Sequence, residues 1–384
     1  MAFSFSDEQV AFRDVVRRFM DDRSAVSEVR RLMDTDSGFD EEVWRQACGE
    51  LGLAGIGLDE RFGGAGFGLV ELGIVAEELG RALYCGPYFS SIVLGARSIL
   101  NVGTDAEKEA MLPALATGDR RATLALHELN GSWDLDDVQC SCVEVDGELQ
   151  LSGSKNLVVD GLTADVLLVV VREQNGSGLS LASVSADARG LERCSLNALD
   201  PTRKLARLTF SSTPATRIGP AGGAADGIRQ TLREACVVLA HESVGGAQQL
   251  FDAALEYTLM RVQFGRVIGS FQAIKHQCAE LLLDLEMTKS AAYSAAEALD
   301  GGDANARAVA SLAKASSSDH YMRMAASCIQ LHGGIGFTWE QDTHLWYKRA
   351  KSSEVFLGTA AYHRELMILN WVGTELDTEK GASA

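Results

Sequence analysis

The chain has 384 residues, of which 46% are apolar and 23% are charged, as expected for a folded protein with a large core. Its formal net charge of -18 repels DNA phosphates and anionic lipid heads, so neither is an expected partner. No stretch approaches the roughly 18 apolar residues of a membrane span, and the first residues lack the basic and apolar regions of a signal peptide.

Residues 7 to about 117 are predicted to be mainly helical. Apolar residues recur at intervals of three and four over residues 9–33, and similar stretches cover residues 40–56, 69–83 and 88–101. Ser6 precedes an acidic first turn and is predicted to cap the first helix. The glycine-rich residues 60–68 are predicted to form a loop.

Residues 122–212 change to short runs that alternate or carry β-branched side chains, with Gly, Asn and Asp between them. Cys140 and Cys142 alternate along one run, which suits a strand better than a metal site. The runs indicate a small antiparallel β domain that ends in the glycine-rich linker 217–227. They predict strands at residues 122–126, 139–145, 148–154, 156–160, 165–171, 179–184 and 205–210.

From residue 228 the helical period returns over longer stretches that are rich in Ala, Ser and Gly, which permits close helix packing. The predicted fold class is α+β, with an N-terminal helical domain (1–118), a middle antiparallel β domain (119–226) and a C-terminal four-helix bundle (227–384). The eight cysteines form no CxxC pair. Without an export signal, we expect them to be reduced thiols in the cytoplasm and expect no metal site.

Two C-terminal stretches suggest chemistry: RVQFGRVIGSFQAIKH (261–276) and IQLHGGIGFTWEQDTHLWYKRAK (329–351). Arg261 offers a planar fork that suits a diphosphate, and Phe264 offers a face for a flat ring. Gly333 and Gly334 follow a predicted helix end at His332, where glycines let a ligand approach backbone N–H groups. The alternative is that these glycines only terminate the helix.

Together with the order helices, strands, helices, these motifs closely resemble the acyl-CoA dehydrogenase family over essentially the whole chain. The resemblance implies FAD bound between subunits of a homotetramer or heterotetramer, an acyl-CoA substrate and an electron-transfer flavoprotein as electron acceptor. It also implies the cofactor contacts, through RxQFG, QxxGG and the Gly-Thr pair after the family's usual glutamate. Carried over to this chain, these are Arg261, Gln263, Phe264, Gln272, Gln330, Gly333, Gly334, Gly358 and Thr359.

One departure concerns the catalytic base, which must remove the α-proton of a thioester while a hydride leaves the β-carbon. The place of the family's glutamate is Leu357, and a leucine side chain cannot accept a proton. Some relatives carry the base on an earlier helix, but that position aligns with Ala235. Glu354, three residues before Leu357, is interpreted as a surface carboxylate.

Two glutamates lie near the second of these positions. Glu242 is seven residues further on, so it returns to nearly the same helix face about 10 Å along the axis. Its apolar surroundings suit a buried proton acceptor, and it is the predicted base. The alternative is a structural glutamate that is paired with a lysine or arginine or hydrogen-bonded in a tetramer interface. Glu234 is the runner-up, and His241 is interpreted as a packed or capping residue. Gly245 and Gly246 are expected to leave room for a ligand.

The β domain matches the family less closely. LHELNGSWD (126–134) stands where relatives have a Thr-Glu-Pro-Gly-like turn, and Glu128, Ser132 and Asp134 partly preserve that turn. NLVVDG (156–161) replaces a Trp-Ile-Thr-like strand, so Val158 and Val159 are only weak candidates for flavin contact.

Three functions remain open at this point. The first is FAD-dependent α,β-dehydrogenation of an acyl-CoA to a 2,3-enoyl-CoA, with a bulky acyl group such as a steroid side chain. The second is a non-catalytic or half-catalytic subunit that shares FAD within a heterotetramer. The third is a flavin monooxygenase or oxidase on the same fold. The two cofactor motifs favour the first function, because a subunit that served only as a scaffold need not keep both.

Overall fold

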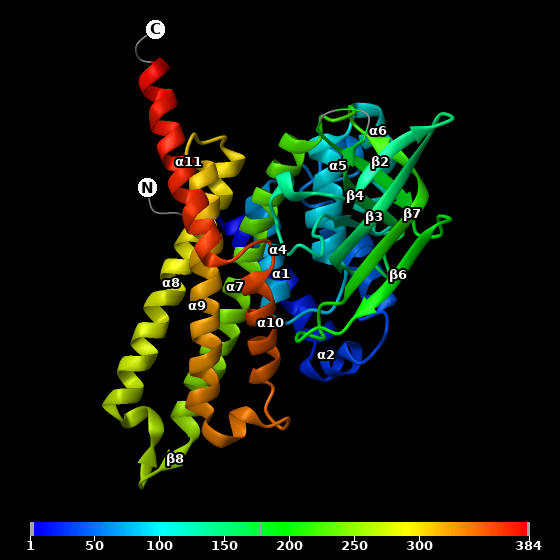
Figure 1. Ribbon diagram of the computed structural model, residues 1–384. Coiled ribbons are helices and arrows are strands. Elements are labelled where there is room, and N and C mark those ends of the chain that lie inside the picture. The colour runs from blue at the N-terminus through cyan, green and yellow to red at the C-terminus, as the bar shows by residue number, and fades with distance from the viewer. Residues whose placement is uncertain (1–3, 175, 177, 382–384) are drawn as a thin grey trace. The chain divides into compact units, whose positions relative to one another are not determined.

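The computed structural model describes residues 4–174, 176 and 178–381, and these form two compact units. The described residues of the first unit lie within the ranges 4–30, 68–84 and 236–381, and those of the second lie within 31–67 and 85–235. The predicted order of helices, strands and helices is confirmed, since the large sheet lies between Ala122 and Ile218 with helices before and after it (Figure 1). The division into three domains at residues 118 and 226 stays a prediction.

The second unit is organised around a seven-stranded sheet. Its strands form where the sequence alternates or is β-branched, but the runs 148–154 and 156–160 join into one strand, with register irregularities at Leu151/Ser152 and Lys155/Val158. One strand, β6, was not predicted from the sequence because its alternation is mostly polar. The strands are β1 (Ala122–Ala125), β2 (Ser141–Val145), β3 (Glu148–Val159), β4 (Val166–Glu173), β5 (Leu179–Ser185), β6 (Leu191–Leu196) and β7 (Leu205–Ile218).

Strand pairing in this sheet is mainly antiparallel, as predicted, with two parallel exceptions. Strands β1 and β2 both pair with β4 in parallel. The pairings β4–β2, β2–β3, β3–β7, β7–β5 and β5–β4 close into a ring. Leu151, Leu167, Val169, Leu208 and Phe210 belong to the apolar core of this closed sheet. The continuous apolar run of β4 is explained by burial on both faces, since residues 166–171 are all buried.

Short helices complete the second unit. Trp44 donates to the Gly118 carbonyl at 2.9 Å, and the Tyr88 hydroxyl donates to the Leu53 carbonyl at 2.9 Å, so the segments before and after residue 85 are joined by buried side chains. Two helices, η1 (Gln46–Glu50) and η4 (Phe89–Ala96), are π-helices, which the helical period did not distinguish. The helices are α3 (Glu41–Arg45), η1 (Gln46–Glu50), η2 (Leu53–Gly55), η3 (Glu60–Phe62), η4 (Phe89–Ala96), α5 (Arg97–Val102), α6 (Asp105–Ala116) and η5 (Leu135–Asp137).

The first unit is a bundle of long helices. Ser6 caps α1 as predicted, in a reciprocal pair of hydrogen bonds with Gln9. The predicted helix over residues 9–33 is broken at Ser24, between α1 and α2. The elements are α1 (Asp7–Arg23), α2 (Val26–Met33), α4 (Leu69–Arg81), α7 (Ala225–Met260), β8 (Val262–Gln263), β9 (Arg266–Val267), η6 (Ile268–Ser270), α8 (Gln272–Asp300), α9 (Ala306–His332), η7 (Gly333–Phe337), α10 (Thr343–Val355) and α11 (Ala360–Gly381). Helix α2 continues into the second unit, and α7 begins there.

Glycines bring α4 and α7 into backbone contact. A Cβ on Gly80 would lie 2.0 Å from the Glu242 carbonyl oxygen, and a Cβ on Gly245 would lie 1.8 Å from the Glu77 carbonyl oxygen. A Cβ on Gly246 would meet the Tyr321 hydroxyl at 2.3 Å. The expectation that Gly245 and Gly246 leave room for a ligand is therefore wrong, because other helices fill the space beside them.

The described residues contain no helix that combines the length and the apolar character needed to cross a membrane.

Candidate functional site

The RxQFG motif forms a tight hairpin just after α7. Arg261 follows the last residue of the helix, and Val262–Gln263 pairs with Arg266–Val267. Phe264 and Gly265 form the two-residue turn with φ values of 54° and 79°, and positive φ at both positions is typical of a type I′ turn. A left-handed backbone is uncommon for phenylalanine. It places the ring at the hairpin tip, where Phe264 is 91% exposed.

The QxxGG motif forms the end of α9. The helix ends at His332 as predicted, and Gly333 continues with a φ of 67°. Both Gly333 and Gly334 are exposed, and a Cβ added to either would meet no atom within 4 Å. The space over their backbone is therefore open to a ligand. Gln330, three residues before Gly333, is also exposed.

A ring contact brings the two motifs to the same end of the bundle. Tyr257 on α7 stacks on His332 on α9, with ring centroids 4.4 Å apart and planes 26° apart. The Cys328 thiol lies 3.3 Å from the Leu250 carbonyl oxygen and joins the same two helices, about one turn earlier on α9 and about two turns earlier on α7. Figure 1 shows the β8 hairpin and the end of α9 at this end of the bundle. We call Arg261, Gln263, Phe264, Gln330, Gly333 and Gly334 the α7/α9 end.

The α7/α9 end fits a flavin nucleotide in its chemistry. It combines a guanidinium for a phosphate, an exposed aromatic ring and glycine backbone that nothing covers. Gln272, the first residue of α8, is exposed beside the hairpin, where Phe264 and Phe271 meet edge to face with centroids 6.1 Å apart.

The Gly358–Thr359 pair lies elsewhere in the bundle. Lys314 on α9 donates to the carbonyl oxygens of Ser353 and Glu354 at 3.0 and 3.4 Å, and so fixes the end of α10 just before this pair. Lys314 precedes His332 by 18 residues, which is about 27 Å of helix. Within one chain, the structure therefore separates Gly358 and Thr359 from the α7/α9 end.

Leu357 keeps an unusual backbone although it lacks the acid. Its φ is 60°, a left-handed conformation that leucine rarely adopts, and its side chain is buried. His363 on α11 lies with Nε2 2.9 Å from the Leu357 carbonyl oxygen and supports the turn. Burial lowers the pKa of His363 to about 4. The turn before Gly358 is thus held by side chains from two helices, α9 and α11.

Glu242 is a buried acid with a cationic partner. It lies on α7, and the Arg349 guanidinium on α10 donates to its Oε1 at 2.9 Å. The side chains are only 9% and 5% exposed. Glu242 lies in the apolar environment expected of it, and the alternative expectation of a pair with a lysine or arginine is met by Arg349, although the sequence did not indicate which residue would be the partner. That partner lies 107 residues away, in the stretch 329–351 that supplied only Gln330, Gly333 and Gly334 to the predicted site.

Glu234, the runner-up, is tied into a different network in the second unit. Its carboxylate accepts from Arg97 Nε at 2.7 Å, Asn101 Nδ2 at 3.0 Å and Gln230 Nε2 at 2.8 Å. These contacts join α5 to the first turns of α7. A carboxylate that accepts from three fixed donors is well suited to hold two helices together and poorly suited to approach a substrate.

The remaining candidates near these acids are structural. His241 is fully buried with Nε2 3.2 Å from the Ala292 carbonyl oxygen, and burial lowers its pKa to about 3, which agrees with a packed histidine. Ala235 is fully buried. Glu354 pairs with Lys351 at 2.6 Å on a partly exposed face of α10.

In the second unit, the turn at residues 126–134 is held by a buried ion pair. Glu128 accepts from Lys155 Nζ at 2.7 Å and from the backbone N–H groups of Gln139 and Cys140 at 2.9 Å each. Lys155 is fully buried and also donates to the Leu126 carbonyl oxygen at 3.0 Å. Glu128 therefore closes this loop with its side chain.

The other loop residues face differently. Ser132 and Asp134 make local turn contacts on the exposed side of the loop. Val158 and Val159 are buried, so their side chains do not point outward from this unit.

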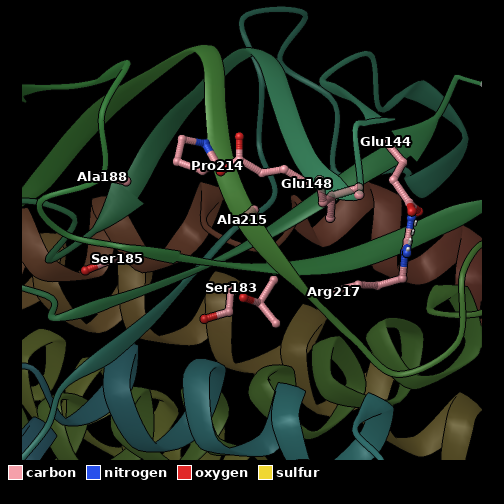
Figure 2. A pocket seen from close by; sticks show the side chains of 11 residues that line it. Glu144, Glu148, Ser183, Ser185, Ala188, Pro214, Ala215 and Arg217 are labelled. Carbon is pink, nitrogen blue, oxygen red and sulfur yellow. Dashed lines mark ion pairs between the residues drawn. The ribbon is translucent and has the colours of Figure 1, made fainter.

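The second unit also has an open hollow on its sheet, of about 680 Å³. Figure 2 shows it, with Glu144 and Arg217 paired at 3.9 Å along one side. Its other labelled side chains are Glu148, Ser183, Ser185, Ala188, Pro214 and Ala215. None of the residues predicted to bind cofactor or to act as the base lines this hollow.

Comparison with known proteins agrees with these motifs. Family models for the N-terminal and C-terminal domains of acyl-CoA dehydrogenases match residues 6–119 and 225–370. Acyl-CoA dehydrogenase IpdE2 from Mycobacterium tuberculosis is 32% identical over 91% of this chain and 93% of its own length. A solved structure of a steroid ACAD, a Tcur3481–Tcur3483 variant, is 28% identical with a TM-score of 0.85, covering 98% of this chain and 99% of its own.

Two further solved structures share the fold at 24% identity. They are butyryl-CoA dehydrogenase from Megasphaera elsdenii, with a TM-score of 0.89, and the ChsE4–ChsE5 complex from Mycobacterium tuberculosis, with a TM-score of 0.86. The first match covers 97% of this chain and 100% of the other, and the second covers 98% and 99%. Fold, motifs and relatives together define an oxidoreductase of the class that acts on CH–CH bonds. The chain belongs to the acyl-CoA dehydrogenase family.

Proposed function

We propose that this protein catalyses FAD-dependent α,β-dehydrogenation of an acyl-CoA thioester, giving a 2,3-enoyl-CoA. The observation that carries the proposal is the α7/α9 end, where Arg261, Phe264 and two uncovered glycines lie together at the Tyr257–His332 stack. Bound flavin would supply the acceptor for the hydride from the substrate β-carbon. An electron-transfer flavoprotein is the proposed acceptor of the two electrons.

Glu242 is the proposed base for the α-proton. It is a buried carboxyl on α7, and the Arg349 guanidinium holds its Oε1 at 2.9 Å; a side chain of this type is the group that can take such a proton. Proton transfer to Glu242 and hydride loss from the β-carbon together remove H⁺ and H⁻, so the substrate is oxidised by two electrons. Glu234 remains the runner-up because its three donors already use its carboxylate.

We propose a tetramer in which neighbouring chains complete each cofactor site. Gly358 and Thr359 are far from the α7/α9 end of the same chain. A cofactor that contacts both groups of residues would therefore take Gly358 and Thr359 from one chain and the α7/α9 end from a neighbouring chain. The first unit also exposes many large apolar side chains, which would be covered in an assembly. They include Leu259, Met260, Leu283, Met287, Phe337, Trp339, Ile368 and Leu369.

The eight free thiols support a reducing, cytoplasmic location. The steroid ACAD relative supports a bulky acyl group as the substrate class to test first.

The proposal is tested by expressing the chain alone and measuring flavin absorbance per chain together with native mass. One flavin per chain in a tetramer, bleached anaerobically by an acyl-CoA, is the expected result. Glu242→Gln should retain flavin and lose this bleaching. If Glu242→Gln desaturates the acyl-CoA at an unchanged rate, Glu242 is not the base. Oxygen consumption without acyl-CoA oxidation would favour a flavin oxidase or monooxygenase.

A second candidate function is supported by the absence of an acid at Leu357 and Ala235 together with the ion pairing of Glu234 and Glu242. The chain could then be a half-catalytic or non-catalytic subunit, as one of two different chains sharing FAD; the ChsE4–ChsE5 relative is itself a complex of two proteins. A colourless or half-loaded protein that gains flavin only with a second acyl-CoA dehydrogenase chain would support this function.

A further inference from the structure

We propose that Lys314 is a positioning residue for the cofactor: its buried ammonium closes the end of α10 and so holds Gly358 and Thr359 in place to meet FAD. The inference rests on the proposed function, because Gly358 and Thr359 are among the residues predicted to bind FAD. It adds a residue that neither the motifs nor the comparisons assign to the site.

The carbonyl groups at the end of α10 are satisfied in an unusual way. A helix leaves its last four carbonyl oxygens without partners inside the helix, and in α10 these belong to residues 352–355. The backbone N–H groups of Phe356 and Gly358 donate to the first and the last of them, at 3.1 and 3.3 Å. The two carbonyl oxygens in between accept from Lys314 Nζ at 3.0 and 3.4 Å. Lys314 therefore completes the end of this helix from a different helix.

Lys314 itself is fully buried on α9. Its Nζ also donates to Ser318 Oγ at 2.6 Å, one turn later on the same helix. An ammonium group has three N–H donors, so the two carbonyl oxygens and this hydroxyl provide an acceptor for each of them. Burial lowers the pKa of Lys314 to about 8, so the group is still mainly protonated at pH 7. Because burying an ammonium group is costly, a lysine here indicates a need for these donors.

The turn after α10 depends on support from its surroundings. Leu357 has a φ of 60°, and a left-handed backbone of this kind persists only where neighbouring contacts hold it. The Leu357 carbonyl oxygen lies 2.9 Å from His363 Nε2. Gly358 follows with a φ of 105°, and a Cβ there would lie 2.6 Å from Tyr362 Cδ1. The turn is thus held by Lys314 before Leu357 and by His363 after it.

This turn decides where Thr359 lies. Gly358 is buried in the chain, whereas Thr359 is exposed, so Thr359 is the member of the pair that a ligand can reach. Only residues 356–359 separate α10 from α11, and the Thr359 carbonyl oxygen accepts from the His363 N–H at 3.0 Å. A buried carbonyl group that loses its donor is costly, so the end of α10 would move without Lys314. Thr359 would move with it.

The alternative is that Lys314 only adds to the stability of the bundle. In that case its loss would lower the free energy of unfolding, but the protein that remains folded would bind FAD with unchanged affinity. A positioning residue differs in two ways. Its loss loosens the turn locally, and it lowers the affinity of the folded protein for FAD.

The test compares wild type with Lys314→Met, which keeps the length of the side chain and removes the donors. His363→Phe removes the second support of the turn and keeps a ring. Arg97→Met is the control for a general loss of stability, because it breaks a buried ion pair in the second unit. Hydrogen–deuterium exchange of the flavin-free protein is measured over residues 352–363, and the FAD dissociation constant is measured by fluorescence titration.

We expect Lys314→Met to exchange the Phe356 and Gly358 amides at least about tenfold faster and to raise the FAD dissociation constant at least about tenfold. Arg97→Met should change neither quantity in the folded protein. If Lys314→Met does not fold, Lys314→Gln, which keeps a shorter donor without the charge, is measured in the same way.

Double variants show whether Lys314 acts through the turn. Lys314→Met combined with His363→Phe should weaken FAD binding by less than the product of the two single effects, because both residues support one turn. Lys314→Met combined with Arg261→Ala should give the full product, because Arg261 lies at the separate α7/α9 end. Full products in both combinations would contradict a shared action of Lys314 and His363 on the turn.

The inference is overturned, with the proposed function intact, if wild type binds FAD and oxidises acyl-CoA while Lys314→Met binds FAD as tightly as Arg97→Met does. Unchanged exchange over residues 352–363 also overturns it. If wild type binds no FAD, alone or with a second acyl-CoA dehydrogenase chain, the proposed function fails and the inference falls with it. Faster exchange in Lys314→Met would then show that Lys314 has a structural role only.

Discussion

Tyr257 and His332 stack face to face, with ring centroids 4.4 Å apart, and so join the last turns of α7 and α9. Of the residues predicted to bind the cofactor, Arg261, Gln263 and Phe264 come shortly after Tyr257, and Gly333 and Gly334 come directly after His332. Their positions thus depend on a contact between residues 75 positions apart, which lies within the first unit. The side chains themselves are free to meet a ligand, because Arg261, Gln263 and Phe264 are exposed.

Arg261→Ala should weaken flavin binding without unfolding the protein. A charged hydrogen bond to a phosphate contributes roughly 1.5–3 kcal/mol, so the FAD dissociation constant should rise by roughly 10-fold to 100-fold. Thermal unfolding of the flavin-free protein should not change, since Arg261 is exposed. Arg323→Ala is the control, because it removes an exposed arginine of α9 that pairs with Asp284 and Glu280. Equal flavin affinity in both variants would remove Arg261 from the proposed site.

The Arg97–Glu234 pair should prove structural. Arg97→Met leaves a buried carboxylate without its cation, and breaking such a pair costs about 3–5 kcal/mol. We expect this loss in the free energy of unfolding by urea, with flavin content per folded chain unchanged. Glu234→Gln should cost less and should still bleach flavin with acyl-CoA. A folded Glu234→Gln protein that cannot be bleached would instead make Glu234 the base.

The Lys155–Glu128 pair should contribute far more stability than a surface pair. Lys155→Met leaves Glu128 buried, and the expected cost is again about 3–5 kcal/mol. Lys351→Met is a matched control, because Lys351 pairs with Glu354 at about the same distance on a partly exposed face and should cost less than about 1 kcal/mol. Urea unfolding followed by circular dichroism measures both. Similar costs for the two variants would contradict the buried role of Lys155.

Stability should fall in acid because of two buried histidines. Burial lowers the pKa of His241 to about 3 and that of His363 to about 4, from 6.5 in each case. Below pH 6.5 the unfolded chain binds protons that the folded chain does not, so the stability present above pH 6.5 is lost as the pH falls towards 4. For His363 alone the loss is on the order of 3 kcal/mol.

Glu77 acts in the opposite direction, since burial raises the pKa of its carboxyl. The histidine contribution is therefore isolated by comparing wild type with His363→Asn in denaturant unfolding between pH 7 and pH 4. The variant should lose less stability over this range than wild type. Parallel pH curves for the two proteins would show that His363 does not contribute.

Periodicity predicted most helical segments and most strands because each depends on residues a few positions apart, although the break at Ser24 and the two π-helices were not predicted. Ser6 and the end of α9 at His332 were found for the same reason. The strand β6 was missed because its alternating pattern is mostly polar, and the parallel pairings of β4 depend on strands far apart in sequence.

The sequence indicates the proposed site only where its motifs are local. RxQFG and QxxGG are short segments whose geometry follows from a hairpin and a helix end. Gly245 was misread because a glycine that admits a ligand and a glycine that admits a helix look the same in sequence. Arg349 was missed because its partner, Glu242, lies 107 residues away.

The glycine contacts between α4 and α7 also matter for engineering. Main-chain atoms meet at Gly80 and Gly245, so even one added methyl group would push these helices apart. The position of Glu242 relative to α4 is thus fixed by contacts between main-chain atoms. Directed evolution for a broader substrate range should therefore leave Gly80 and Gly245 unchanged and vary residues elsewhere. Neither glycine can be replaced by a larger residue without displacing Glu242.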